Sequence, residues 1–190
     1  MVFKIEKTKL IPCTFKIVFN SIQKVCEKLN WKIISVRYLG MSSISLIDCL
    51  TENMIKINVT VSDWKDAINA AGELLIKAKV AEPCYIQAMI DFCEQHNAYI
   101  VIAPGIALPH ARPEDGAIKV GVSLVTLKKP VAFGHTENDP VDLIIALCAP
   151  DNKEHVNVIA ELAERLMNKE SVNKIRNAKS KKEVITILKS

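Results

Sequence analysis

Apolar residues recur every three to four positions in several segments of this chain, the spacing that places them on one face of an α-helix. The clearest segment runs from Ser62, a residue type suited to an N-cap, to about Ala78. A second begins at Pro83, which suits the first turn of a helix, and ends near His96. Three further helices are predicted towards the C-terminus, at about 153–167, 171–177 and 181–188.

Between these helical segments lie stretches rich in β-branched residues, which favour strands. Strands are predicted at 99–103, 120–127 and 141–149. The last is apolar at almost every position, as in a central strand buried on both faces. Helices before and after a block of strands predict a layered α/β architecture, with helices on both faces of a mixed sheet.

The first forty residues differ from the rest in charge. Eight Lys or Arg against two Glu give them a net charge of +6, whereas the whole chain carries +4, which leaves −2 for the remainder. The pattern predicts a helix at 15–29 and a strand at 31–39, followed by a break at Gly40 and a second methionine at Met41. We therefore expect a basic N-terminal extension, 1–40, and a main domain, 41–190.

Composition narrows the classes of function. Hydrophobic residues make up 49% of 190 residues, enough for one core. The six cysteines are scattered without a Cys-x-x-Cys pair, and no apolar run approaches the length of a membrane helix, so a cytoplasmic protein without membrane insertion is expected. No zinc-protease, Walker, dinucleotide or serine-hydrolase motif occurs, and no nucleic-acid-binding motif accompanies the basic extension.

One loop is a candidate for chemistry, the segment APGIALPHARPEDG at 103–116. Pro109 fixes its own φ and restricts Leu108 to extended geometry, so the backbone that presents His110 has few alternatives. Arg112 is the nearest cation that could balance an anion there. Gly105 and Gly116 could let backbone N–H groups approach as well.

An imidazole is largely neutral near pH 7, so one ring nitrogen can attack phosphorus while a hydrogen bond holds the other. His110 can therefore accept and release a phosphoryl group, with Arg112 offsetting charge on its oxygens. A single histidine in a proline-rich loop is also commonly structural, and the residues alone leave that alternative open. His96 and His135 are expected at the surface.

Several segments together resemble the type-2 IIA domains of the bacterial sugar phosphotransferase system. They are PGIALPHARPEDG, KVGVSLVTLKKPVAFG and ENDPVDLIIALCAPDNKEHVNVIAEL, and the resemblance covers roughly 46–189. The LPHAR core, the PEDG continuation and the segment 61–64 look most like the ascorbate branch. The resemblance implies a three-layer α/β/α sandwich with a mixed sheet. It also implies that His110 takes a phosphoryl group from the phosphocarrier HPr and passes it to a cysteine of a IIB protein, which serves a IIC permease, without metal or organic cofactor.

His155 matches a second histidine that lies near the site in the mannitol branch, where it can support the phosphoryl group. Alternatively it is an ordinary residue in the first turn of a surface helix. That branch also has an arginine in the helix before the site. This chain has none between Arg37 and Arg112, so such support is absent here or comes from Arg112 or a lysine.

A related class of protein remains an alternative. Regulatory IIA-like domains of the nitrogen type control a partner protein through their phosphorylation state and transport no sugar. The ascorbate-like motif and the lack of an appended regulatory module favour transport.

Overall fold

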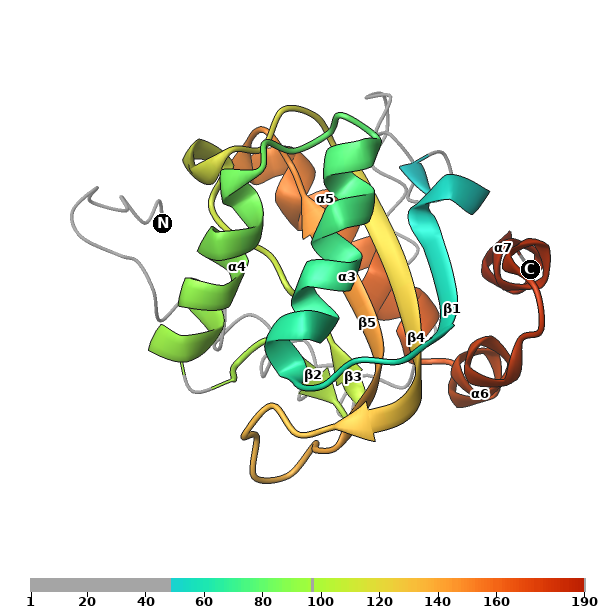
Figure 1. The fold of residues 1–190 in the computed structure, drawn as a ribbon. Helices are drawn as coiled ribbons and strands as arrows, with labels where there is room; N and C mark the ends of the chain where they lie inside the picture. Colours follow the sequence, from blue (N-terminus) through green and yellow to red (C-terminus); the bar gives the residue numbers. More distant parts are fainter. Residues whose placement is uncertain (1–48, 97, 190) are drawn as a thin grey trace, which may run out of the picture. The chain divides into compact units, whose positions relative to one another are not determined.

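A computed structural model describes residues 49–96 and 98–189, so the helix and strand predicted within 1–40 lie outside the described residues. Its centre is a five-stranded sheet in the order β1-β4-β5-β3-β2 (Figure 1). The strands are β1 Ile55–Val59, β2 Val101–Ala103, β3 Ile106–Ala107, β4 Gly121–Val131 and β5 Val141–Cys148. Pairs β1–β4 and β3–β5 are parallel, and pairs β4–β5 and β2–β3 are antiparallel. The predicted mixed sheet is confirmed.

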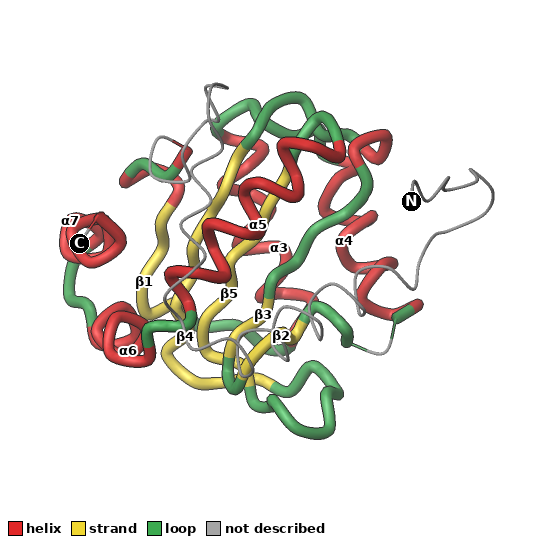
Figure 2. The backbone as a smooth tube through the Cα atoms, turned by 180° about the vertical axis from the view of Figure 1, so that it is seen from behind, coloured by secondary structure: helices red, strands yellow, loops and turns green. Residues whose placement is uncertain are grey.

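Helices cover both faces of this sheet. Helices α3 (Trp64–Lys77) and α4 (Cys84–Gln95) lie on one face, and α5 (Asn152–Leu166) lies on the other, as Figures 1 and 2 show from opposite sides. Helices α6 (Lys169–Asn177) and α7 (Lys181–Lys189) follow, and α7 contacts β1. Two short 3-10 turns, η1 (Glu52–Met54) and η2 (Pro113–Asp115), complete the described elements. The predicted three-layer α/β/α sandwich is confirmed.

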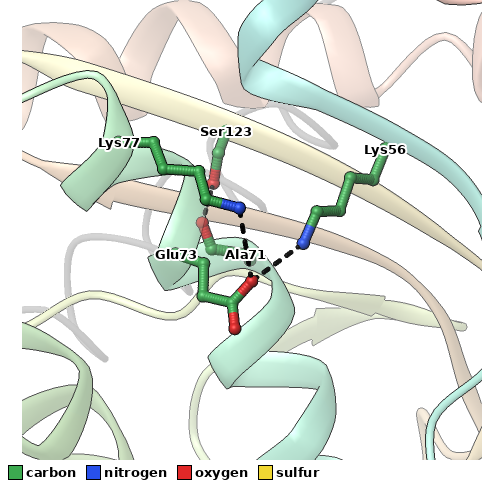
Figure 3. A network of polar contacts seen from close by, with 5 residues as sticks. All are labelled: Lys56, Ala71, Glu73, Lys77 and Ser123. Atoms are coloured by element: carbon green, nitrogen blue, oxygen red, sulfur yellow. Dashed lines mark hydrogen bonds and ion pairs between the residues drawn. The ribbon is translucent and has the colours of Figure 1, made fainter.

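The core forms where α3 meets the two central strands. All side chains from Leu143 to Cys148 in β5 are at most 1% exposed, as a strand covered on both faces requires. The buried hydroxyl of Ser123 in β4 donates to the carbonyl of Ala71 in α3 (2.8 Å), which satisfies both groups (Figure 3). At the rim, Glu73 accepts from Lys56 of β1 (3.1 Å). These contacts fix α3 against the sheet.

Local predictions needed several corrections. The N-cap of α3 is Asp63 and not Ser62, because the Asp63 carboxylate accepts the N–H of Asp66 (2.9 Å) while the Ser62 hydroxyl bonds the Asp66 side chain. Strands β1 and β3 were not predicted; each is short, and each is set by pairing with a longer strand distant in sequence. Strand β2 begins at 101 rather than 99, after a turn in which Ala98 has a φ of 56°.

None of the helices in the described part of the chain combines the length and the apolarity that a membrane crossing needs.

Candidate active site

The segment 108–111, here called the site loop, is attached to the sheet by backbone bonds on both sides. It leaves β3, and the N–H of Leu108 donates to the carbonyl of Ile100 (2.7 Å). One residue on, the carbonyl of Pro109 accepts the N–H of Leu147 in β5 (3.0 Å). Leu108 and Ala111 are buried. Backbone hydrogen bonds to the turn before β2 and to strand β5 therefore hold the loop next to His110.

A tyrosine of α4 holds the end of the site loop. The hydroxyl of Tyr85 accepts the N–H of Ala111 (3.1 Å) and lies 3.0 Å from the carbonyl of Leu147 and 3.1 Å from that of Ala111. Tyr85 is only 1% exposed, and burial raises the pKa of its hydroxyl, so it stays protonated. One side chain thereby joins helix α4, the loop and strand β5.

An arginine of α6 holds the chain just ahead of β3. Arg176 donates through Nε to Asp142 Oδ1 (2.9 Å) and through Nη2 to the carbonyl of Pro104 (2.9 Å). Gly105 beside it has a φ of 76°, and a Cβ there would collide with the guanidinium. The N–H of Gly105 donates to the main-chain carbonyl of Asn138 (2.8 Å), and the N–H of Gly116 donates to the carbonyl of Pro113 (3.4 Å). These two N–H groups, expected near an anion, are used within the fold.

The hydrogen bond of His110 determines which ring nitrogen is nucleophilic. Its Nδ1 lies 2.8 Å from the carbonyl of Leu108. Because a carbonyl can only accept, Nδ1 carries the hydrogen and Nε2 carries the lone pair. The residue is 8% exposed, and its ring contacts those of Phe92 and His155, with a centroid separation of 5.2 Å to each.

Both rings of the histidine pair are held neutral. Burial lowers the pKa of His110, against the effect of the Leu108 carbonyl, and His96 lowers it further by Coulomb repulsion. Burial, followed by repulsion from His110, lowers the pKa of His155 to about 4. The structure thus brings His155 beside His110, as the mannitol-like match implied, although it lies in the first turn of α5. Asp151 caps that turn by accepting the N–H of Glu154 (2.9 Å).

Arg112 and His135 take part in other hydrogen bonds. Arg112 is exposed, and its main-chain N–H donates to the Asp115 carboxylate (3.0 Å). His135 lines a separate cavity of about 530 Å³, together with Trp64 and Phe133. Its Nδ1 accepts the N–H groups of residues 137 and 138. No group of three His, Cys, Asp or Glu side chains that could hold a metal ion occurs among the described residues.

Phe92 and His96 were not foreseen as site residues. Phe92 packs its ring on His110, and the ring of His96 meets Phe92 nearly edge-on, at 4.3 Å and 88°. His96, expected at the surface, is half-buried. A signal existed in the sequence: Phe92 is seven residues after Tyr85, and positions two helical turns apart share a face. The spacing could not show that Phe92 packs against His110, because the two residues belong to different elements.

Depressed pKa values at His110 and His155 predict a pH-dependent stability. The unfolded chain takes up protons at these residues near pH 6.5, whereas native His155 does so only near pH 4. Stability is therefore full above pH 6.5 and is lost as the pH falls from 6.5 towards 4. We expect the free energy of unfolding to fall by about 2 kcal/mol from His155 alone between pH 7 and pH 5. Urea unfolding at both pH values measures it.

The matched variant for that measurement is His155→Gln. It keeps a polar side chain of similar length but does not titrate, so its stability should vary less between pH 7 and pH 5. An unchanged pH dependence in this variant would contradict the assignment.

Comparison with known proteins agrees with this geometry. The family described as "Phosphoenolpyruvate-dependent sugar phosphotransferase system, EIIA 2" matches residues 48–190. The ascorbate-specific PTS system EIIA component of Escherichia coli K12 is 41% identical over 145 residues, which are 75% of this chain and 94% of that protein. The component from Shigella sonnei has the same identity and coverage.

Solved structures show the same fold. The solution structure of the mannitol-specific cryptic phosphotransferase enzyme IIA CmtB from E. coli has a TM-score of 0.70 and 34% identity, covering 76% of this chain and 98% of that one. Enzyme IIA of mannitol, in its complex with phosphorylated enzyme IIB from E. coli, has a TM-score of 0.66 and 31% identity, with 74% and 96% covered.

A mixed sheet covered by helices on both faces is the fold that this chain shares with solved phosphotransferase IIA proteins. The chain belongs to the EIIA 2 family of the phosphoenolpyruvate-dependent sugar phosphotransferase system. It is a phosphotransferase component that carries a phosphoryl group in sugar uptake.

Proposed function

We propose that His110 carries the phosphoryl group, which it accepts on Nε2 from phospho-HPr and passes to a cysteine of a IIB protein. The observation that supports this most directly is the bond between Nδ1 and Leu108, because it leaves the lone pair on Nε2. A lowered pKa keeps that lone pair unprotonated at pH 7. The rigid site loop limits the ring to one orientation, which favours in-line attack.

Both chemical steps balance without a cofactor. In the first, Nε2 attacks phosphorus, a P–N bond forms, and the bond from phosphorus to the donor breaks. The carbonyl of Leu108 stabilises the Nδ1–H as positive charge develops on the ring. In the second, a thiolate of the IIB protein attacks phosphorus, and His110 leaves with the electron pair of the P–N bond.

His155 and Arg112 are proposed to support the phosphoryl group. The ring of His155 is 5.2 Å from that of His110 and becomes easier to protonate once a dianion is attached there. Arg112 is two residues from His110 and exposed, so it would have to turn from solvent towards the phosphoryl oxygens. We therefore assign the larger share of this support to His155.

The proposed sugar is ascorbate, and the proposed compartment is the cytoplasm. Relatives 41% identical over almost their full length are ascorbate-specific EIIA components. A structural neighbour forms a complex with its phosphorylated IIB partner, which supports a IIB protein as acceptor and, through it, a IIC permease. We place this activity in residues 41–190, since the family match begins at residue 48.

Incubation with phosphoenolpyruvate, enzyme I and HPr tests this function. Intact-mass analysis at mildly basic pH, which preserves phosphohistidine, should show one added phosphoryl group. Addition of an ascorbate-type IIB protein should then move the group to the IIB cysteine. A chain that stays unlabelled would overturn the proposed function. A labelled chain that passes nothing to any IIB protein would favour the regulatory, nitrogen-type role.

A further inference from the structure

Three consecutive ring contacts connect His110 to histidines on both sides. One side is the direct contact with His155 of α5. On the other side, Phe92 packs against His110 at 5.2 Å, and His96 packs against Phe92 at 4.3 Å. His96 is thus separated from His110 by a single phenyl ring. No water fits between rings in contact, so charge on His96 acts on His110 through a medium of low polarity.

Helix α4 ends at His96. The charged side chains of the helix are Asp91 and Glu94, both acidic. His96 is the C-cap, where its N–H donates to the Phe92 carbonyl. The C-terminus of a helix carries partial negative charge and favours a protonated imidazole. The electrostatic coupling between His96 and His110 is already present without phosphate, because His96 lowers the pKa of His110.

We propose that His96 is the charge-balancing residue of the phosphorylated state, taking up a proton when His110 becomes phosphorylated and stabilising the phosphoryl group across the Phe92 ring. The proposal rests on the proposed function of His110. It assigns His96 no contact with phosphorus, so His96 is a positioning residue and not a catalytic one. A dianion on His110, which one phenyl ring separates from His96, raises the affinity of His96 for a proton. By linkage, the proton stabilises phospho-His110 by the same factor.

The elements that carry these rings, and the turns next to them, hold other titratable groups, whose effects must be separated from that of His96. They are His155 and Glu154 of α5, Asp91 and Glu94 of α4, Tyr99 of the following turn and Arg112. Of these, His155 is the other imidazole, and its ring contacts that of His110. Its contribution is removed by repeating the measurements in a His155→Gln background.

Two substitutions at position 96 isolate the charge. His96→Gln is neutral at every pH, and His96→Lys is positive up to about pH 10. The measured quantity is the equilibrium constant for phosphoryl transfer from phospho-HPr, expressed as variant over wild type so that the pH dependence of HPr cancels. For His96→Gln we expect a roughly 3- to 10-fold loss at pH 6 that vanishes at pH 9. For His96→Lys we expect wild-type values at pH 6 and a gain at pH 9.

A spectroscopic measurement checks the same claim without a variant. The imidazole resonances of His96 in the wild-type protein, followed by NMR against pH, should give a pKa higher by about 0.5–1 unit in the phosphorylated than in the free form. This titration decides the matter if the position 96 variants fail to fold. An unchanged His96 pKa, or a His96→Gln ratio that is the same at pH 6 and pH 9, overturns the proposal. A wild-type chain that accepts no phosphoryl group contradicts the proposed function instead.

Discussion

Replacement of His110 by glutamine should abolish phosphoryl acceptance completely, because the amide cannot form the P–N bond that the Nε2 lone pair forms. The fold should persist, since the imidazole bonds the carbonyl of Leu108, two residues away, and an amide N–H can replace that bond. Intact-mass analysis after incubation with phosphoenolpyruvate, enzyme I and HPr measures the loss. Circular dichroism confirms that the variant is folded.

The matched control is His135→Gln. His135 lines a different cavity, and its Nδ1 accepts two backbone N–H groups that a glutamine carbonyl can also accept. This variant should be phosphorylated like the wild type. A phosphoryl group found on His110→Gln, or lost from His135→Gln, would show that another histidine is the acceptor.

Substitution of Tyr85 by phenylalanine removes only the hydroxyl group, and we expect a large loss of stability from it. The hydroxyl is buried, accepts the N–H of Ala111, and lies within hydrogen-bond distance of the carbonyls of Ala111 and Leu147. Water cannot easily replace it at 1% exposure. Because an unsatisfied buried polar group costs about 1–3 kcal/mol, we expect the free energy of unfolding to fall by about 3 kcal/mol. Urea unfolding measures the change.

The same variant should also slow phosphoryl acceptance, because Ala111 adjoins His110 and would no longer be held. Thr186→Val serves as the control: it removes an exposed hydroxyl that bonds Lys182 within α7. Its effect should stay within about 0.5 kcal/mol. A Tyr85→Phe variant as stable as this control would refute the role of the hydroxyl.

The pattern of apolar residues was sufficient to locate the helices and the central strand in the sequence. Repeats of three to four residues located α3 and α4, and the continuous apolar run at 141–149 identified β5 as the strand buried on both faces. These features are local, since each follows from the periodicity of one backbone conformation. Strands β1 and β3 were not predicted, because strands of five and two residues show too little periodicity in their apolar positions.

In the candidate site, too, the sequence predicted local features but not the contacts between distant segments. Pro109 and its neighbours identified the rigid loop and placed His110 within it, since the restriction that proline imposes on the backbone is local. The sequence also led to Arg112, the nearest cation along the chain, which the structure shows exposed while His110 is buried. The support that Arg112 would give to the phosphoryl group therefore stays a prediction.

By itself, then, the sequence determined the layered α/β class, the loop that presents His110 and the resemblance to a phosphotransferase family. Only the tertiary structure decided that Nδ1 bonds Leu108, that Tyr85 holds Ala111 and Leu147, and that Phe92 and His155 enclose the ring. Most of these contacts join segments 18 to 62 residues apart, with the Leu108 bond as the local exception. Such pairs depend on how helices and strands pack, and packing is set by the whole core and not by the spacing of residues within one element.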